Sequence, residues 1–404
     1  MPSHPTTPKI AICGAGPVSL TLANILQNHS IPFTVYEASS SLRTWGGSLD
    51  LHRESGQAAL REAGLWDAFT RVSRPESDVR KIVALDGTVL WDGNTCDAAQ
   101  EPAAMEDDKY DGRPEIDRRA LVALLAQNLA PDAVVFEHKV SSVIPVPGTA
   151  QHTLFFADTT TAGPFDLVIG GDGAWSSVRS LLSPTKPQYS GITMASASLS
   201  NIHTDPELQE YVGAGTLFAF GRDTALIAQR GDAGFLSVYA CLRVGEGFVE
   251  ECRIDWEGDA GTARERLMQG WFGHVDSRLR DVFLSARDEL TPRKLYELPV
   301  GFEWAHRPGV TLMGDAAHLM TPFAGVGVNV GMQDALVLGR EIVGWCEGTK
   351  GLDEAVRAYE EEMVPRAKQF AERTMKGKEG HFSEDGSEAF VKKLRAARNA
   401  TKAG

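Results

Sequence analysis

The stretch KIAICGAGPVS, residues 9–19, decides the fold of this chain. Its first five residues form a short apolar run that stops at glycine, which is typical of a buried parallel strand. After the glycines, apolar residues recur at helical spacing as far as Leu26, and residues 33–36 (FTVY) predict a second strand. The order of strand, glycine turn, helix and strand predicts a βαβ unit that opens an α/β fold.

The glycine turn and the acid that follows the second strand form the pattern of a dinucleotide site. Gly14 permits a tight turn, and Gly16 lets the backbone approach a pyrophosphate at the helix N-terminus. Ser19 stands where a third glycine is usual. Glu37 follows 21 residues after Gly16, where a carboxylate accepts hydrogen bonds from a ribose. Because this carboxylate repels a 2′-phosphate, the pattern favours FAD or NAD here and does not separate the two.

A second informative stretch is GDAAHLMTPFAGVGVNVGMQDA, residues 314–335, which indicates a strand end, an acid, a proline-glycine loop and a helix. Asp315 suits the hydroxyls of a sugar-like chain. Gly325 and Gly327 let the backbone lie against a flat ring, and the next helix N-terminus favours negative charge such as that of a reduced flavin. We interpret His318 as a packed or capping side chain, because one histidine without partners makes neither a metal site nor a triad.

Composition limits the class of protein. The 404 residues are 43% hydrophobic, which fits two packed domains, and the net charge of −14 argues against a nucleic-acid partner. The five cysteines are scattered without a CxxC pair, which disfavours a zinc site and indicates a reducing compartment. We see neither the pattern of a secretory leader nor a run of eighteen apolar residues in the sequence. We therefore expect a cytoplasmic protein without a membrane span.

The sequence pattern changes between residues 188 and 298. Segments such as 216–220 and 235–242 are β-rich or alternate between apolar and polar residues, which predicts an antiparallel sheet. We expect an α/β architecture in which this sheet is inserted into a Rossmann-like nucleotide domain. The expected divisions are a nucleotide domain at 1–187 with short excursions into the other domain, a β-rich substrate domain at 188–298, the second part of the nucleotide domain at 299–365, and a helical segment at 366–404. Only one dinucleotide fingerprint is present, so a second nucleotide domain is not expected.

Three motifs in this order and spacing, Gly14-x-Gly16, Asp172-Gly173 and Gly314-Asp315, resemble the signatures of the class A flavoprotein monooxygenases, the family of para-hydroxybenzoate hydroxylase. The resemblance runs from about residue 9 to residue 365. Within the family, residues 45–52 (WGGSLDLH) are most similar to the tetracycline-inactivating flavin monooxygenases. The resemblance implies bound FAD, NAD(P)H as a transient co-substrate, and O2.

The resemblance also implies roles for single residues, none of them a nucleophile or a base. Glu37 would bind the adenosine ribose, the backbone of Val140 the adenine, and Asp172 both FAD and NAD(P)H. Arg118, with Arg113 as the alternative, would reach the FAD. The remaining positions expected near the flavin or the incoming nicotinamide are Arg43, Asp50, Asp315, Pro322, Gly325, Gly327, Val328 and Asn329.

The substrate pocket is expected at the interface between the nucleotide domain and the β-rich sheet. Its candidate lining residues, each of which also suits a packed core, are Phe218, Phe220, Gln229, Tyr239, Phe323 and Met375. The polar residues with which the tetracycline enzymes hold their drug are not evidently matched near Ser196, Thr216 and Ser237. An apolar lining favours an aromatic or polycyclic metabolite over a charged sugar.

The sequence thus predicts an NAD(P)H-consuming, FAD-dependent monooxygenase of secondary metabolism. The resemblance implies that one oxygen atom of O2 passes through a C4a-hydroperoxyflavin to a small aromatic or polycyclic substrate. Three alternatives stay open: an FAD-dependent oxidoreductase without oxygen insertion, a tetracycline-degrading hydroxylase, and a nucleotide-binding scaffold without turnover. We expect a monomer or a weak homodimer.

Overall fold

Strand β1 (Ile10–Cys13) lies at the centre of the first sheet of the computed structural model, which describes residues 8–43, 46–95 and 110–403. The sheet is parallel throughout, and all four residues of β1 are buried. Its strands, in spatial order, are β17 (Val310–Leu312), β11 (Leu167–Gly170), β1, β2 (Phe33–Tyr36) and β7 (Val134–Val135). The predicted βαβ unit is therefore confirmed, with α1 (Pro17–Asn28) as its helix.

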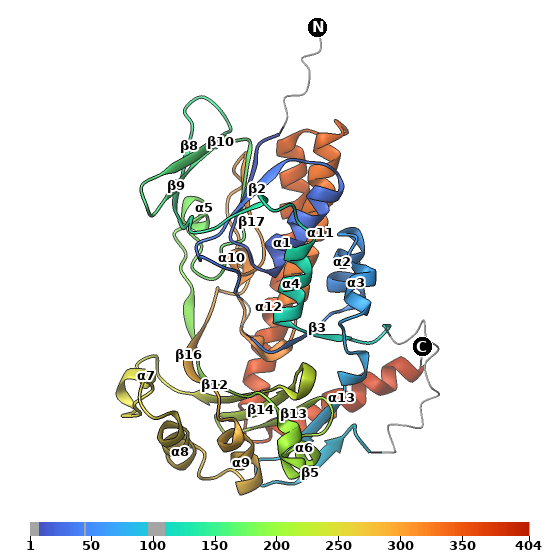
Figure 1. Cartoon of the computed structure of the whole chain (residues 1–404), viewed down its shortest axis with the longest axis vertical. Coiled ribbons are helices and arrows are strands. Elements are labelled where there is room, and N and C mark those ends of the chain that lie inside the picture. Colours follow the sequence, from blue (N-terminus) through green and yellow to red (C-terminus); the bar gives the residue numbers. More distant parts are fainter. Residues whose placement is uncertain (1–7, 44–45, 96–109, 404) are drawn as a thin grey trace.

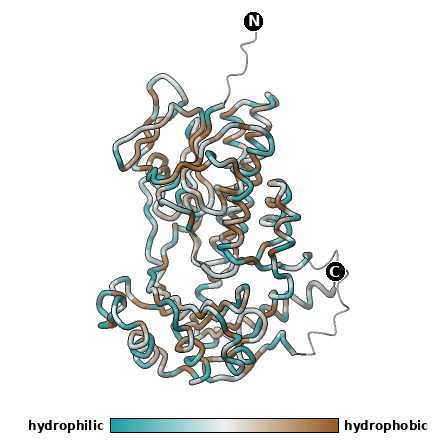
Figure 2. The backbone as a smooth tube through the Cα atoms, in the orientation of Figure 1, coloured by the Kyte–Doolittle hydropathy of each residue, from teal (hydrophilic) through white to brown (hydrophobic). Residues whose placement is uncertain are grey.

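Helices cover this sheet and complete the five-stranded unit. They share one hydrophobic core with the strands, and Figure 2 shows hydrophobic segments gathered where sheet and helices meet. The long helices are α4 (Arg118–Gln127), α11 (Gly327–Cys346) and α12 (Leu352–His381). The smaller elements are β3 (Ser48–Asp50), β6 (Glu115–Asp117), β8 (Val140–Pro145), β9 (His152–Phe156), β10 (Thr161–Phe165), η1 (Arg53–Gln57), α2 (Ala58–Glu62), α3 (Trp66–Thr70), η2 (Pro75–Ser77), α5 (Arg179–Leu182), α10 (Asp315–His318) and η5 (Pro322–Ala324).

A seven-stranded sheet forms the second unit, at the bottom of Figure 1. Its strands, in spatial order, are β16 (Leu290–Glu297), β12 (Gln188–Leu199), β15 (Leu236–Arg243), β14 (Thr224–Arg230), β13 (Thr216–Gly221), β4 (Arg80–Val83) and β5 (Val89–Asp92). The antiparallel sheet expected between residues 188 and 298 is confirmed for the strands from that range, and β4, from outside it, joins the sheet by pairing with β13 in parallel. This happens because β4 arrives from the five-stranded unit instead of from a neighbouring hairpin.

Different elements pack on the two faces of the seven-stranded sheet. One face packs under helices that the β-rich interpretation of residues 188–298 missed. These helices are α6 (Pro206–Val212), α7 (Phe248–Glu251), α8 (Ala260–Trp271) and α9 (Ser277–Ser285), with the short turns η3 (Ile202–Thr204) and η4 (Asp232–Gly234). The other face carries a small aromatic core. Helix α13 (Gly386–Ala403) packs against β13, β4 and β5.

Helix α12 links the two units. Figure 1 shows it running from the five-stranded unit down to the seven-stranded sheet. It continues through Pro365, so the chain has no break at the expected division between residues 365 and 366. Over the described ranges, none of the helices combines the length and the apolar character needed to cross a bilayer.

Candidate functional site

The glycine turn after β1 has a closed side and an open side. Gly14 has φ +90°, and a Cβ there would lie 2.6 Å from the carbonyl oxygen of Gly171. Gly16 has φ −75°, and a Cβ there would meet nothing within 4 Å. Gly14 therefore allows the chain to pack, whereas Gly16 opens space in front of the N-terminus of α1. That space is where a pyrophosphate is expected to lie.

Ser19 is accommodated by a glycine on the neighbouring strand. Its side chain is fully buried, and its hydroxyl has no hydrogen-bond partner among the described residues. A Cβ at Gly171 would collide with the Ser19 hydroxyl. The close approach of helix and strand that a third glycine usually permits is thus provided by Gly171, directly before Asp172.

Glu37 lies next to this turn. Its Oε2 accepts a hydrogen bond of 2.8 Å from the backbone N–H of Ala15, and its Oε1 accepts one of 2.9 Å from the N–H of Ser39. Each carboxylate oxygen keeps a further lone pair that a ribose hydroxyl can use. The two backbone bonds hold the carboxylate beside the open side of the Gly14–Gly16 turn.

The Asp172 segment is fixed beside β8. Oδ2 of Asp172 accepts a hydrogen bond of 2.8 Å from the N–H of Ser177, while its Oδ1 is buried without a partner. Burial raises the pKa of Asp172 despite these hydrogen bonds. The hydroxyl of Ser177 donates to the carbonyl oxygen of Val140 at 2.9 Å. Asp172 and Val140, both expected to bind FAD, are therefore joined through one serine.

Arg179 connects the Asp172 segment to the Asp315 segment. Its guanidinium is buried and donates to the carbonyl oxygens of Ala174 at 2.5 Å and Ala316 at 3.0 Å. Segments that lie more than 130 residues apart in the sequence are thereby held together. No short motif could reveal this, because an arginine that binds backbone carbonyls leaves no characteristic spacing.

Asp315 is the first residue of α10. Its side chain is exposed to solvent, yet the surrounding protein desolvates the carboxyl enough to raise its pKa, against the opposing charges of His318 and Arg118. Asp315 follows Gly314, whose φ of +59° turns the chain out of β17.

The two candidate arginines lie in different places. The Arg118 side chain runs along Gly46, where a Cβ would lie 2.7 Å from Cδ of Arg118. Its charge acts on Asp315. Arg113 instead lies beside Asp50, with Nη1 3.7 Å from Oδ2. Of the two, Arg118 is the arginine that lies near Asp315.

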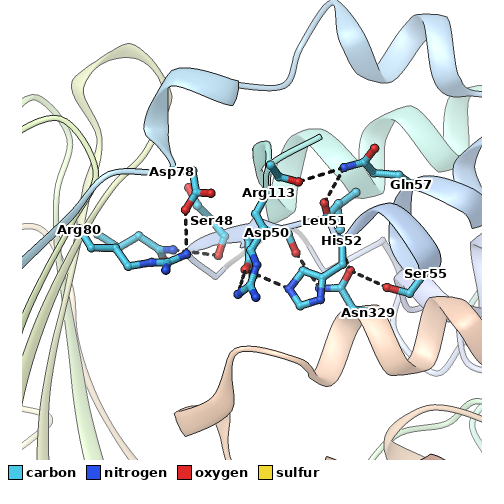
Figure 3. A network of polar contacts seen from close by, with 12 residues as sticks. Ser48, Asp50, Leu51, His52, Ser55, Gln57, Asp78, Arg80, Arg113 and Asn329 are labelled. Carbon is cyan, nitrogen blue, oxygen red and sulfur yellow. Dashed lines mark hydrogen bonds and ion pairs between the residues drawn. The ribbon is translucent and has the colours of Figure 1, made fainter. Parts of the chain in front are cut away.

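Asn329 ties the Asp50–Ser55 segment to α11, as Figure 3 shows. Its Oδ1 accepts hydrogen bonds from the N–H of His52 at 2.8 Å and from the hydroxyl of Ser55 at 3.2 Å. Its Nδ2 donates to the carbonyl oxygen of Asp50 at 2.7 Å. The side chain of Asn329 therefore positions a neighbouring segment, and its place beside the flavin stays a prediction.

Asp50 faces the glycine loop before α11. A Cβ at Gly325 would lie 4.0 Å from Oδ1 of Asp50. Burial by itself would raise the pKa of Asp50, but His52 at 3.3 Å and the charges of Arg113 and Arg80 lower it (Figure 3). Asp50 thus stays ionised at the edge of the loop. Arg43 is exposed, shortly before this segment.

The loop that joins η5 to α11 has an open surface. Pro322, Gly325 and Gly327 are exposed, and Val328 is half-buried. Gly325 adopts the left-handed conformation with φ +64°. A Cβ at Gly327 would meet nothing within 4 Å, so backbone is accessible at the N-terminus of α11.

These observations fit FAD. A Cβ would meet nothing within 4 Å at Gly16, Gly173 and Gly327, and each of these glycines lies in or beside a different motif. Arg179 holds two of the motif segments together, and Asp315 lies in the second of them with an exposed side chain. No group of three or more His, Cys, Asp or Glu suited to a metal ion occurs in the described part of the chain.

Five of the six predicted pocket residues lie around Gly47 or in the aromatic core, and Tyr239 contacts both. Gln229 and Tyr239 press against Gly47, where a Cβ would lie 2.5 Å from Oε1 of Gln229. Phe220 and Phe323 are buried in the aromatic core, which Phe218 borders. Met375 of α12 is 37% exposed.

Sequence reasoning missed the C-terminal partners of this aromatic core. Phe220 stacks on His381 at 4.1 Å between ring centroids, and Phe390 packs edge-on against Phe218 at 5.5 Å. His381 and Phe390 come from α12 and α13, which carry no recognisable motif. Only the helical spacing of aromatic residues near the C-terminus could have indicated them.

Comparisons with known proteins agree with this geometry. The FAD binding domain family matches residues 300–374. Monooxygenase asqM of Emericella nidulans is 32% identical, with 95% of this chain and 97% of the relative covered. Monooxygenase penA of Penicillium thymicola is 30% identical, over 94% and 96% of the two chains.

Solved structures show the same fold. Klebsiella pneumoniae HpxO complexed with FAD and uric acid has a TM-score of 0.76 at 20% identity, covering 96% of this chain and 93% of its own. Tetracycline destructase Tet(55) has a TM-score of 0.71 at 17% identity, with 98% and 96% covered. The expected fold class is thereby confirmed, and the chain belongs to the FAD-dependent monooxygenases of the class A, aromatic-hydroxylase type.

Proposed function

We propose that this monooxygenase hydroxylates a small aromatic or polycyclic secondary metabolite at the interface between its two units. The reaction consumes the substrate, O2, NAD(P)H and a proton, and it yields the oxygenated product, water and NAD(P)+. The observation that carries the proposal is the meeting of three motif segments. Gly14 packs against Gly171, Arg179 binds the carbonyl oxygen of Ala316, and the charge of Arg118 acts on Asp315.

The residues of the site have separate tasks in this proposal. Glu37 and the open turn at Gly16 bind the adenosine and pyrophosphate part of FAD, and Asp315 binds the hydroxyls of its ribityl chain. The backbone from Pro322 to Gly327 lies against the ring, where the N-terminus of α11 favours negative charge. Bound FAD supplies the hydride acceptor and the O2 chemistry, and the protein supplies orientation and a water-poor cavity.

The aromatic core and the relatives support the substrate class. An apolar wall lies between the sheet and helices α12 and α13. It contains Phe323, and Phe218 and Phe390 pack against it. Relatives include 3-amino-4-hydroxybenzoate 2-monooxygenase of Streptomyces cremeus, 27% identical, and 6-methylsalicylate 1-monooxygenase atA of Aspergillus terreus, also 27% identical. Both names specify substituted benzoates, so hydroxylated aromatic acids are the first substrates to test.

Three measurements on the purified full chain test this proposal. FAD titration should give a tight 1:1 complex, and NAD(P)H should bleach the bound flavin. The rate of NAD(P)H oxidation is then measured with a panel of hydroxybenzoates, polycyclic phenols and tetracyclines, and a true substrate should raise it. Label from 18O2 should enter the product. Substrate oxidation without label would establish an oxidoreductase without oxygen insertion, and flavin that NAD(P)H never bleaches would establish a scaffold.

We also propose that the nicotinamide cofactor docks transiently near Arg43, and that the protein works in the cytoplasm as a monomer or weak homodimer. The exposed Arg43 beside the Asp50 segment supports the first part, and the free cysteines of the described residues support a reducing compartment. Arg43→Ala should raise KM for NAD(P)H without changing FAD affinity. Light scattering at several concentrations tests the oligomeric state.

A further inference from the structure

His318 has a partner, contrary to the expectation that it stands alone. Its ring is buried, and its Nε2 lies 2.5 Å from Oδ2 of Asp334, which is fully buried in α11. The same Oδ2 accepts a hydrogen bond of 2.8 Å from the N–H of Gly314. Oδ1 of Asp334 accepts one of 2.9 Å from Arg366 of α12. One carboxylate thus joins the turn before Asp315 to two long helices.

This carboxylate fixes the turn that directs Asp315. Gly314 has a positive φ of +59°, and its N–H is bound by Asp334. A Cβ at Gly331 of α11 would lie 3.4 Å from the Cα of Gly314, so helix and turn are in close contact. A change at Asp334 or at its partners would therefore reach Asp315 directly.

Three acids, Asp315, Asp334 and the Glu362 that also pairs with Arg366, stand against two arginines, Arg366 and Arg118, so a protonated His318 balances the charge of the group. Asp315 from α10 and Asp334 from α11 are acids that face His318, and Arg366 from α12 reaches Asp334 from its other side. Burial by itself lowers the pKa of His318, but Asp334 and Asp315 raise it above its ordinary value. Conversely, burial would raise the pKa of Asp334, and the charges of His318 and Arg366 lower it. A neutral His318 would leave a buried excess of negative charge, which is costly.

We propose that His318 is a positioning residue for the cofactor: as an imidazolium bound to Asp334, it balances the buried acids and holds Asp315 ionised and directed at the ribityl chain of FAD. The inference rests on the proposed function, because it assumes that Asp315 binds FAD. Neutralising His318 would place excess negative charge beside a cofactor that carries a negative pyrophosphate. It would disfavour the reduced, negatively charged flavin still more.

His318→Gln keeps a hydrogen-bond donor toward Asp334 and removes the charge. We expect FAD affinity, measured by flavin fluorescence quenching, to fall about tenfold or more. The midpoint potential of the flavin should move to a more negative value. In the parent protein FAD affinity should decrease as pH is raised above the ordinary range of histidine, because His318 then loses its proton, whereas His318→Gln should show a flatter profile.

His306 provides a matched control. It is also a largely buried histidine between carboxylates, with Nδ1 2.6 Å from Glu360 and Nε2 2.8 Å from Asp353. It precedes β17, whereas Asp315 follows that strand. His306→Gln should lower stability in urea unfolding and leave FAD affinity and flavin potential unchanged.

The outcomes separate this inference from the proposed function. If the parent protein takes up no FAD, the proposed function fails. If it binds FAD and His318→Gln matches it in affinity, potential and pH profile, only the role of His318 is wrong. Should His318→Gln not fold, the pH profile of the parent decides: an FAD affinity that does not fall as pH is raised contradicts the proposal.

Discussion

Gly14 and Gly16 share one turn but meet different surroundings, so alanine at Gly14 should lower stability and alanine at Gly16 should lower FAD affinity. Gly14→Ala places a Cβ 2.6 Å from the Gly171 carbonyl at φ +90°, and we expect a loss of about 2 kcal/mol or more of unfolding free energy. Gly16→Ala has room in the protein, so apoprotein stability should change by about 1 kcal/mol at most. Its FAD affinity should fall about tenfold or more, because the methyl group enters the pyrophosphate space.

Urea unfolding of the apoproteins and FAD titration measure the two quantities separately. A Gly16→Ala protein that binds FAD as tightly as the parent would show that the pyrophosphate does not lie at this turn. A Gly14→Ala protein of unchanged stability would contradict the packing of β1 against the Gly171 segment.

At the scale of elements, the attachment of α13 depends on one buried serine. The hydroxyl of Ser387 accepts a hydrogen bond of 2.9 Å from the N–H of Phe220. It lies 2.8 Å from the carbonyl oxygen of Val83, to which it donates. Ser387→Ala leaves buried backbone groups of β4 and β13 without this partner, and we expect a loss of about 1–3 kcal/mol in urea unfolding.

Ser141 is a matched control for Ser387, because its hydroxyl also bonds a strand carbonyl, that of Phe155 at 2.9 Å, but on the surface. Ser141→Ala should change the unfolding free energy by no more than about 0.5 kcal/mol. Equal effects of the two substitutions would mean that α13 is not held by Ser387. Limited proteolysis near the C-terminus would then give a second reading of how firmly the helix is attached.

At the scale of the whole molecule, a buried acid lies where the two units meet. Glu115 of β6 pairs with Asp50 of β3, and Arg74 lies 3.9 Å away. Burial raises the pKa of Glu115 to about 8. The charge of Arg74 opposes this shift, and the charges of Asp50, Asp78 and Asp117 add to it. The folded protein therefore keeps a proton on Glu115 that the unfolded chain loses near its ordinary pKa.

This difference in the pKa of Glu115 between the folded and the unfolded chain lowers the free energy of unfolding at higher pH. As pH rises from 5 to 8 the unfolded chain releases the proton first, so the stability that the protonated group contributes is lost. Glu115→Gln lacks this effect. Relative to the parent it should gain about 1 kcal/mol or more of unfolding free energy between pH 5 and pH 8, measured by urea unfolding. A difference that is independent of pH would contradict the raised pKa.

Local patterns predicted the elements near the motifs well. The strand at residues 33–36 and the helix after Gly327 follow from apolar periodicity and glycine positions, which act over a few residues. The helices α6–α9 were missed because short β-rich stretches on either side dominated that region. The partner of His318 was missed because Asp334 lies 16 residues further along the chain, with a loop between them.

The sequence by itself determined the βαβ opening, the three motif segments and the family, because backbone conformation and phosphate binding at a helix N-terminus depend on residues close together in the chain. Only the tertiary structure decided how the side chains are used: Asn329 binds the Asp50 segment, Arg118 and not Arg113 is directed toward Asp315, and His318 is paired with Asp334. These outcomes depend on which distant segments come into contact. Burial then forces each polar group to find a partner, and local spacing carries no record of that choice.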